Sequence, residues 1–182
     1  LIERARPRLK RALIYDPVGG KDIADHMRTN SAAGFDLMQT DVVQSLVQSR
    51  ISAAIGIPVQ HFEGPTVLHY APGEQITNHY DFVNPRIPNY ETEIRKRGQR
   101  VMTFLVYLND DYEDGETEFP TVGLRYRGGK RGGLVFANSL PSGQPDLRMV
   151  HAGRPPRDGA KWVLSQFVRN RIVLGARAEN TA

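Results

Sequence analysis

Cysteine is absent from the 182-residue chain. A disulfide framework, a thiolate metal site and a cysteine nucleophile are therefore excluded, and a reducing compartment such as the cytoplasm is the expected location. No apolar run approaches the roughly 18 residues that a helix needs to span a bilayer. The basic start at 1–7 lacks the apolar stretch of a signal peptide. Because the first residue is Leu1 and not Met, we expect a fragment or a processed chain.

Charge of one sign is not concentrated anywhere in the chain. The formal net charge of +4 and the pI near 9.5 would suit a nucleic-acid partner or an acidic substrate. However, the Lys and Arg residues are interleaved with acids, which is typical of an ordinary solvated surface. With 40% hydrophobic and 24% charged residues, the composition is that of a globular protein. The length predicts one domain over residues 1–182.

One helix is clear in the sequence. Asp41 can cap its start, Gly56 and Pro58 end it, and its apolar residues recur at a spacing that predicts a stripe lying on a sheet: Val43, Leu46, Val47, Ile51 and Ile55. The period then changes to two, which predicts strands over 66–70, around 79, and over 100–108, 116–119 and 161–168. Many short strands after one helix predict a mainly β fold, α+β by content, built as a sandwich or barrel with helices on one side.

Two stretches lack a regular pattern. Residues 82–99 contain two prolines, and a loop of this length inside a compact domain is usually a lid or a binding loop; a disordered insertion is the alternative. The glycine-rich stretch 128–133 lies beside basic residues, but it lacks the phosphate-loop pattern. We therefore expect a hairpin turn there.

His79 and Asp81 carry the first chemical signal. On an extended strand these residues point to the same face. With a second imidazole, for which His151 is the candidate, they would form the 2-His-1-carboxylate triad of non-haem Fe(II) oxygenases. Such a triad leaves three metal positions open, enough for a bidentate 2-oxoacid and O2. Lys161 follows His151 by ten residues, and a buried lysine needs a carboxylate partner. Taken singly, an exposed histidine or a surface lysine would explain each residue equally well.

The motifs together resemble a known family, the prolyl 4-hydroxylase catalytic domain of the Fe(II)/2-oxoglutarate dioxygenases. They cover nearly the whole chain and comprise the segments RTNS (28–31), LHYAPGEQ (68–75), HYDF (79–82), RVMTFLVYLN (100–109), GETEFP (115–120) and FANSLPSG (136–143), followed by HAG (151–153) and KW (161–162). The resemblance implies a double-stranded β-helix, a distorted cupin-like jelly-roll with N-terminal helices packed on one sheet.

The resemblance also implies a role for each matching residue. His79, Asp81 and His151 would bind Fe(II), and Lys161 would pair with the distal carboxylate of 2-oxoglutarate. The Tyr70 hydroxyl would help to hold this cosubstrate. Further matching positions would line the same pocket or lie near a peptide groove, namely Thr103 and Tyr107 for the pocket and Arg28 for the groove. Residues 82–99 and 15–27 match two mobile loops that close over the substrate.

The family pattern is not matched everywhere. Asp114-Gly115 replaces a Gly-Gly pair, Ala152 follows the distal histidine, and Phe167 replaces a second tryptophan. None of these changes removes a proposed ligand, so they bear on substrate fit and not on the iron chemistry. Elements that the family has before residue 9 have no counterpart, which indicates an N-terminal truncation or a different upstream domain.

The activity implied by the resemblance is hydroxylation of a prolyl residue in a peptide or protein, with Fe(II), 2-oxoglutarate and O2, release of succinate and CO2, and ascorbate as an optional addition. An oxygenase of the same superfamily acting on a free amino acid or on nucleic acid is one alternative. The nucleic-acid demethylases pair 2-oxoglutarate with arginine, so Lys161 speaks against them. A non-catalytic peptide-binding jelly-roll is the other alternative, and it would not need all three ligands plus the lysine. The oligomeric state is left open.

Overall fold

Two β-sheets form the body of the protein, in a computed structural model that describes residues 1–16, 20–37, 40–87 and 90–173. The larger sheet has the order β1-β4-β5-β14-β7-β11, formed by Lys10–Arg11, Ser31–Gly34, Thr66–Tyr70, Lys161–Arg169, Arg100–Tyr107 and Gly133–Ala137. The smaller sheet has the order β10-β9-β12-β6, formed by Leu124–Tyr126, Thr117–Phe119, His151–Gly153 and Ile76–His79. The pairings within these sheets are antiparallel. The mainly β prediction is confirmed.

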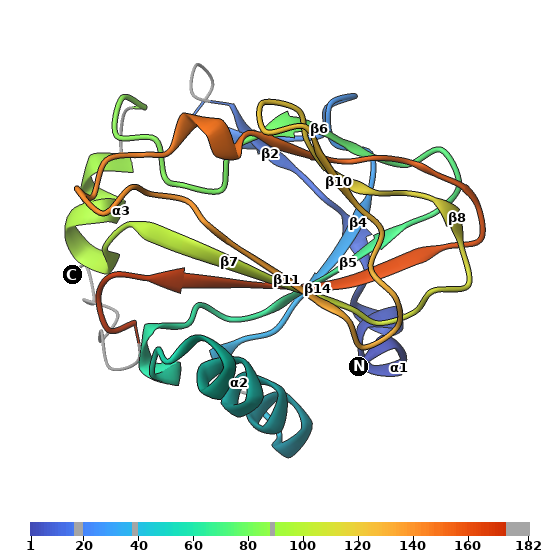
Figure 1. The fold of residues 1–182 in the computed structure, drawn as a ribbon, viewed down its shortest axis with the longest axis horizontal. Coiled ribbons are helices and arrows are strands. Elements are labelled where there is room, and N and C mark those ends of the chain that lie inside the picture. Colours follow the sequence, from blue (N-terminus) through green and yellow to red (C-terminus); the bar gives the residue numbers. More distant parts are fainter. Residues whose placement is uncertain (17–19, 38–39, 88–89, 174–182) are drawn as a thin grey trace.

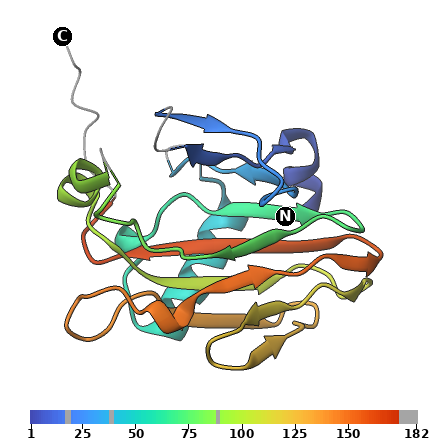
Figure 2. The same cartoon turned by 90° about the horizontal axis from the view of Figure 1, so that it is seen from above.

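Short elements complete the fold. Two-stranded pairs are formed by β13 (Pro156–Asp158) with β8 (Glu113–Asp114) and by β2 (Ile14–Asp16) with β3 (Lys21–Ile23). The chain starts with α1 (Ile2–Ala5) and the 3-10 turn η1 (Arg6–Arg8), and the turns η3 (Val59–His61) and η4 (Leu147–Met149) lie further along. Seen from above, the N-terminal strands lie along one side of the sheets (Figure 2). Within the described residues, no helix has the length and apolar character that a bilayer crossing requires.

The predicted helix is α2 (Val42–Ile55), which lies against the larger sheet on the side away from β6 and β10 (Figure 1). The Asp41 side chain accepts a hydrogen bond from the Gln44 amide, and Gly56 ends the helix at a φ of +70°, a conformation that costs glycine little. The predicted apolar stripe is wrong at Leu46, which is 58% exposed. The buried face instead includes Gln48, whose amide donates to Gln166 in β14 at 3.1 Å.

The larger sheet has apolar side chains on both faces, because β7 and β14 alternate. One apolar cluster lies between this sheet and the helices and contains Trp162, Leu164 and Val168 of β14. A second cluster faces the smaller sheet and contains Leu105, Tyr107, Phe119, Phe136 and Val163. The odd-numbered residues of β14 therefore point toward the space between the sheets, where Lys161 and Ser165 also lie. The predicted two faces of the 100–108 strand are confirmed.

Two predictions for irregular stretches are wrong. Residues 90–97, inside the stretch expected to be a loop, form the helix α3 (Tyr90–Arg97), while residues 88–89 and 17–19 lie outside the described residues. The glycine-rich stretch is not a hairpin turn, because β10 and β11 on either side of it belong to different sheets. It crosses between the sheets and folds back on the end of β7, where a Cβ at Gly128 would lie 2.1 Å from the Tyr107 ring.

Candidate active site

Three side chains with metal-binding atoms meet where β6 and β12 pair. His79 and His151 are directly opposite each other in these strands, and their Nε2 atoms lie 3.5 and 3.4 Å from the two carboxylate oxygens of Asp81. The three donor atoms lie within 4.8 Å of one another. Asp81 is not on the strand itself, since β6 ends at His79, yet its carboxylate faces both imidazoles. The structure thus brings the predicted triad together.

The backbone orients both imidazoles. The Nδ1 atom of His79 is 2.9 Å from the Thr77 carbonyl, and that of His151 is 3.0 Å from the Met149 carbonyl. A carbonyl only accepts, so each Nδ1 carries a proton, and in the neutral form of each ring Nε2 is then the atom with a lone pair for a metal. Metal-binding histidines typically donate the N–H of their other ring nitrogen to a carbonyl or a carboxylate in this way. Two imidazole nitrogens and one carboxylate, with room beside them for further ligands, are a donor set that suits Fe(II).

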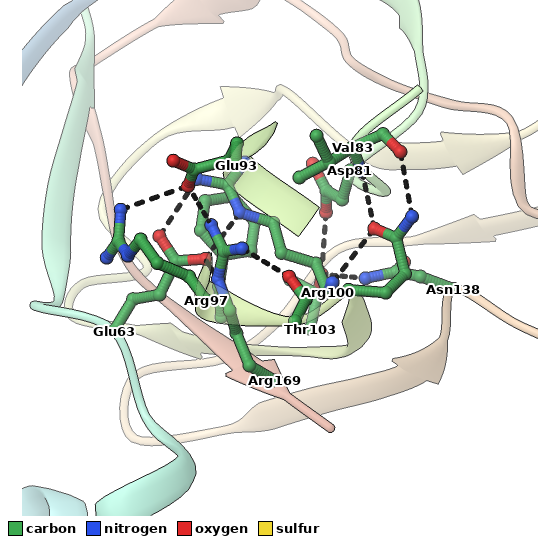
Figure 3. Close-up of polar contacts among 12 residues, drawn as sticks. Glu63, Asp81, Val83, Glu93, Arg97, Arg100, Thr103, Asn138 and Arg169 are labelled. Atoms are coloured by element: carbon green, nitrogen blue, oxygen red, sulfur yellow. Dashed lines mark hydrogen bonds and ion pairs between the residues drawn. The ribbon is translucent and has the colours of Figure 1, made fainter. Parts of the chain in front are cut away.

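Asp81 is fixed by two further buried side chains. The Thr103 hydroxyl donates to Asp81 Oδ2 at 2.7 Å and accepts from the Asn138 amide at 2.9 Å, as Figure 3 shows. Burial opposes ionisation of Asp81, but the neighbouring His151 and His79 and the Thr103 hydrogen bond outweigh it, so the pKa of Asp81 is lowered. Burial also lowers the pKa of His151. The expected donor state, a carboxylate beside a neutral imidazole, is therefore favoured.

A cavity of about 310 Å³ extends from the triad between the two sheets and is lined by Tyr70 and Lys161. Lys161 is 1% exposed and is directly opposite Tyr70 in the strand pair. Its Nζ donates to the Gly115 carbonyl at 2.7 Å and lies 4.2 Å from the centre of the Tyr70 ring. Burial lowers the pKa of Lys161 to about 7, against a smaller opposite effect of Glu116. Among the described residues, no carboxylate forms an ion pair with this ammonium.

Tyr70 and Arg28 also line the cavity, as expected for residues that contact a ligand. Burial raises the pKa of Tyr70 to about 12, so its hydroxyl stays protonated and can donate. A Cβ at position 153 would lie 3.0 Å from this hydroxyl, so Gly153 allows the close approach. The Arg28 guanidinium is directed to Asn30 Oδ1 at 3.3 Å and to the Leu13 carbonyl at 3.4 Å.

Thr103 and Tyr107 do not line the cavity. Thr103 holds Asp81, as described above. The Tyr107 hydroxyl lies 2.8 Å from the Thr117 hydroxyl, and Thr117 does line the cavity. Both residues lie behind the wall, which places them one contact further from a ligand than expected.

The cavity wall contains charged and aromatic residues to which the sequence analysis gave no role. Arg100 and Phe167 line it, with the guanidinium carbon 3.9 Å from the centre of the Phe167 ring. Arg100 and Asp81 also line a second cavity of about 540 Å³, together with aromatic residues at positions 15, 80, 82 and 90. Arg100 starts a motif used above for the family resemblance, but the motif alone gave it no role.

Comparison with known proteins decides the family. The family model for the 2OG-Fe(II) oxygenase superfamily matches residues 65–169, more than half of the chain, and this range contains the triad and Lys161. The chain belongs to the 2OG-Fe(II) oxygenase superfamily. The family prediction is confirmed, and the name of the superfamily, together with the donor set, gives Fe(II), 2-oxoglutarate and O2 as cofactor and cosubstrates.

Among relatives of this superfamily member, prolyl 4-hydroxylase subunit alpha-1 of Gallus gallus is 34% identical over 93% of the chain and 32% of its own length. Probable prolyl 4-hydroxylase 10 of Arabidopsis thaliana is 32% identical over 93% of the chain and 63% of its own length. The chain thus spans between about a third and two thirds of the length of these curated relatives.

Solved structures agree with the fold of this superfamily member. The viral collagen prolyl hydroxylase of Paramecium Bursaria Chlorella virus-1, in complex with 2OG, has a TM-score of 0.61 and 25% identity, and the match covers 78% of this chain and 79% of that one. A prolyl hydroxylase of Trichoplax adhaerens, in complex with a hypoxia inducible factor peptide fragment, has a TM-score of 0.63 at 14% identity, covering 92% and 73%. The predicted double-stranded β-helix is confirmed.

Proposed function

We propose that this chain is an Fe(II)- and 2-oxoglutarate-dependent dioxygenase that hydroxylates a prolyl residue in a peptide or protein. The observation that carries the proposal is the coincidence, in one cavity, of the triad with a buried, unpaired ammonium. Bound Fe(II), 2-oxoglutarate and O2 would supply the oxidising chemistry. The names of the curated relatives support a prolyl substrate.

The residues of the chain have separate tasks in this proposal. His79, Asp81 and His151 hold the metal. Lys161, in its ammonium form, pairs with the distal carboxylate of 2-oxoglutarate, because a buried cation is stabilised only by a matching anion. The Tyr70 hydroxyl donates to the same cosubstrate, and Arg28, which lines the cavity, contacts the peptide.

The larger second cavity supports a peptide substrate over a free amino acid. It adjoins the triad through Asp81 and Arg100 and is wide enough, at about 540 Å³, for residues that flank the reacting one. We propose that residues 1–182 work as one domain, and that 82–99 cover the bound peptide as a lid. A cytoplasmic location stays a prediction.

The test is a turnover assay with Fe(II), 2-oxoglutarate, ascorbate and peptides that differ only in proline or alanine at one position. Succinate release and a mass gain of one oxygen are expected with the proline peptide. His79→Ala should abolish both, whereas Arg50→Ala, a change of an exposed residue of α2, should leave both intact. Equal turnover by wild type and His79→Ala would remove the triad from the mechanism, and equal oxidation of both peptides would overturn the prolyl assignment.

A further inference from the structure

Helix α3 (Tyr90–Arg97) lacks the buried apolar face that normally holds a helix against the rest of a protein. It has eight residues, and none of them is buried. Isolated helices of this length are unstable in water, and most helices in proteins are stabilised by packing of an apolar face. Something other than apolar packing must therefore keep α3 where it is.

A buried guanidinium provides one such contact, in addition to the exposed Arg171, whose Nη1 atom donates to the Arg95 carbonyl at 2.6 Å. Arg169 is the last residue of β14 and is 1% exposed, and its Nη2 atom donates to Glu93 Oε1 at 2.7 Å. Its Nη1 atom donates to the carbonyl of Gly98, just after α3. Figure 3 shows Arg169 between the helix residue Glu93 and the core residue Glu63. Hydrogen bonds between charged groups are stronger than neutral ones, so this contact can position a helix that lacks apolar packing.

The other side of Arg169 is attached to the cavity wall. Its Nε atom donates to Glu63 Oε1 at 2.7 Å, and the same carboxylate accepts two bonds from Arg100, at 2.6 and 2.9 Å. Burial opposes ionisation of Glu63, but the two guanidinium groups outweigh it and lower its pKa. The carboxylates of Glu63 and Glu93 compensate the charge of the buried Arg169, and Glu63 also pairs with the half-buried Arg100. The chain of contacts runs without a break from the cavity to the helix.

This network determines the shape of the second cavity. Tyr90 and Glu93 of α3 line it, together with Arg100 and Arg169. The Tyr90 ring also packs against that of Tyr15, with the ring centres 5.2 Å apart, so α3 also contacts strand β2. If α3 moved away, the cavity would lose one wall, while the triad, which is formed by β6, β12 and the residues just after β6, would keep its own contacts.

We propose that Arg169 and Glu93 are positioning residues: their ion pair fixes α3 as the wall of the second cavity, and thereby sets the affinity for the part of the substrate that flanks the reacting residue. The inference rests on the proposed function for the identity of that substrate, but not for the anchoring of α3. Glu93 is the residue to change, because Arg169 then keeps Glu63 and the Gly98 carbonyl, and the core stays paired.

The experiment compares Glu93→Ala with two matched variants. Glu91→Ala removes an exposed carboxylate from the same helix, and Arg97→Gln removes the surface partner of Glu93, 3.1 Å away, which contributes little. Hydrogen exchange is followed in the amides of 90–98, and the KM values for peptide and for 2-oxoglutarate are measured. Glu93→Ala should speed exchange in α3 about tenfold and raise the KM for peptide about tenfold, with the KM for 2-oxoglutarate unchanged. Both matched variants should behave as wild type.

The exchange data need no turnover, so they test the anchor even if no peptide is hydroxylated. Unchanged exchange in Glu93→Ala, or the same increase in Glu91→Ala, would overturn the anchor. Faster exchange with an unaltered KM for peptide would overturn the link to substrate affinity. Absence of turnover in the wild-type protein would instead count against the proposed function.

Discussion

Strand β14 has a buried cation at each end, and the two cations are treated in opposite ways. Lys161, its first residue, and Arg169, its last, are each 1% exposed. Arg169 has two carboxylate partners, Glu63 and Glu93, whereas Lys161 has a backbone carbonyl and an aromatic ring. Burying a charge is costly unless it is paired. The paired cation is therefore part of the scaffold, whereas Lys161 has no carboxylate partner among the described residues, as the proposed pairing with an anionic cosubstrate requires.

The pKa behaviour follows the same division. Desolvation lowers the pKa of Lys161 to about 7, because the nearby Glu116 and the Gly115 carbonyl compensate only in part for the lost water. At the other end of the strand, the carboxylate of Glu63 stays ionised in spite of its burial. A strongly shifted group inside a cavity is an indicator of a ligand site, and this contrast shows why one buried cation is such an indicator and the other is not.

The largest expected effect comes from removing a carboxylate partner of Arg169, the paired cation at the end of β14. Glu63→Gln removes the carboxylate shared by Arg100 and Arg169. It should lower the free energy of unfolding by about 3 kcal/mol, since the buried Arg169 then keeps only Glu93 and the half-buried Arg100 loses its carboxylate partner. Urea denaturation measures this, with Glu91→Gln on the exposed face of α3 as the control. A loss below about 1 kcal/mol would show that the two guanidinium groups do not depend on Glu63.

The next effect comes from removing the ammonium of Lys161, the cation without a carboxylate partner at the start of β14. Lys161→Met should leave the free energy of unfolding unchanged or raise it, because a buried ammonium without a carboxylate partner is removed. The affinity for 2-oxoglutarate should fall at least about thirtyfold, as expected when one partner of a buried charge pair is truncated. Calorimetric titration measures the affinity, and Lys10→Met, at an exposed position, is the control. Retained affinity would contradict the assigned role of Lys161.

The smallest effect is a pH dependence that sharpens the contrast. Because the free ammonium of Lys161 has a pKa of about 7, the affinity for 2-oxoglutarate should decrease above pH 7, by up to about tenfold per unit, with uptake of a proton on binding. Titrations in buffers of different ionisation enthalpy detect that proton. A flat profile from pH 6 to 9 would be the contrary result.

The same shift has a consequence for stability, with a defined sign. An unfolded lysine titrates near 10.4, so between about pH 7 and 10 the unfolded chain binds more protons at this position than the folded one. The contribution of Lys161 to the free energy of unfolding therefore rises with pH in this window. Lys161→Met should remove that slope.

Much of this site could be predicted because it depends on local patterns. Asp41 and Gly56 bracket α2 as capping rules require, and the period of two placed Tyr70 and Lys161 on strands. The triad followed from ligand chemistry, although Asp81 lies just past the end of its strand. Leu46 was misplaced because the helix buries Gln44 and Gln48 instead, and a glutamine that is satisfied by a distant partner such as Gln166 is not visible in a periodic pattern.

The contacts that could not be predicted join residues far apart in the chain. Helix α3 has no apolar stripe, so no local pattern indicates it, and its anchor Arg169 is 76 residues from Glu93. Thr103 was expected in the cavity wall, but it holds Asp81 from 22 residues away. The glycine-rich crossing was read as a hairpin because nothing local tells a turn within one sheet from a passage between two.

The opposed positions of His79 and His151 have a mechanical consequence. β6 is an edge strand of the smaller sheet. His79 on β6 and His151 on β12 are directly opposite each other where the two strands pair. A metal ion bound by both imidazoles would cross-link these two strands. Removal of this metal ion should then weaken the pairing of β6 with β12 first, while the apolar cluster between the larger sheet and α2 keeps its packing.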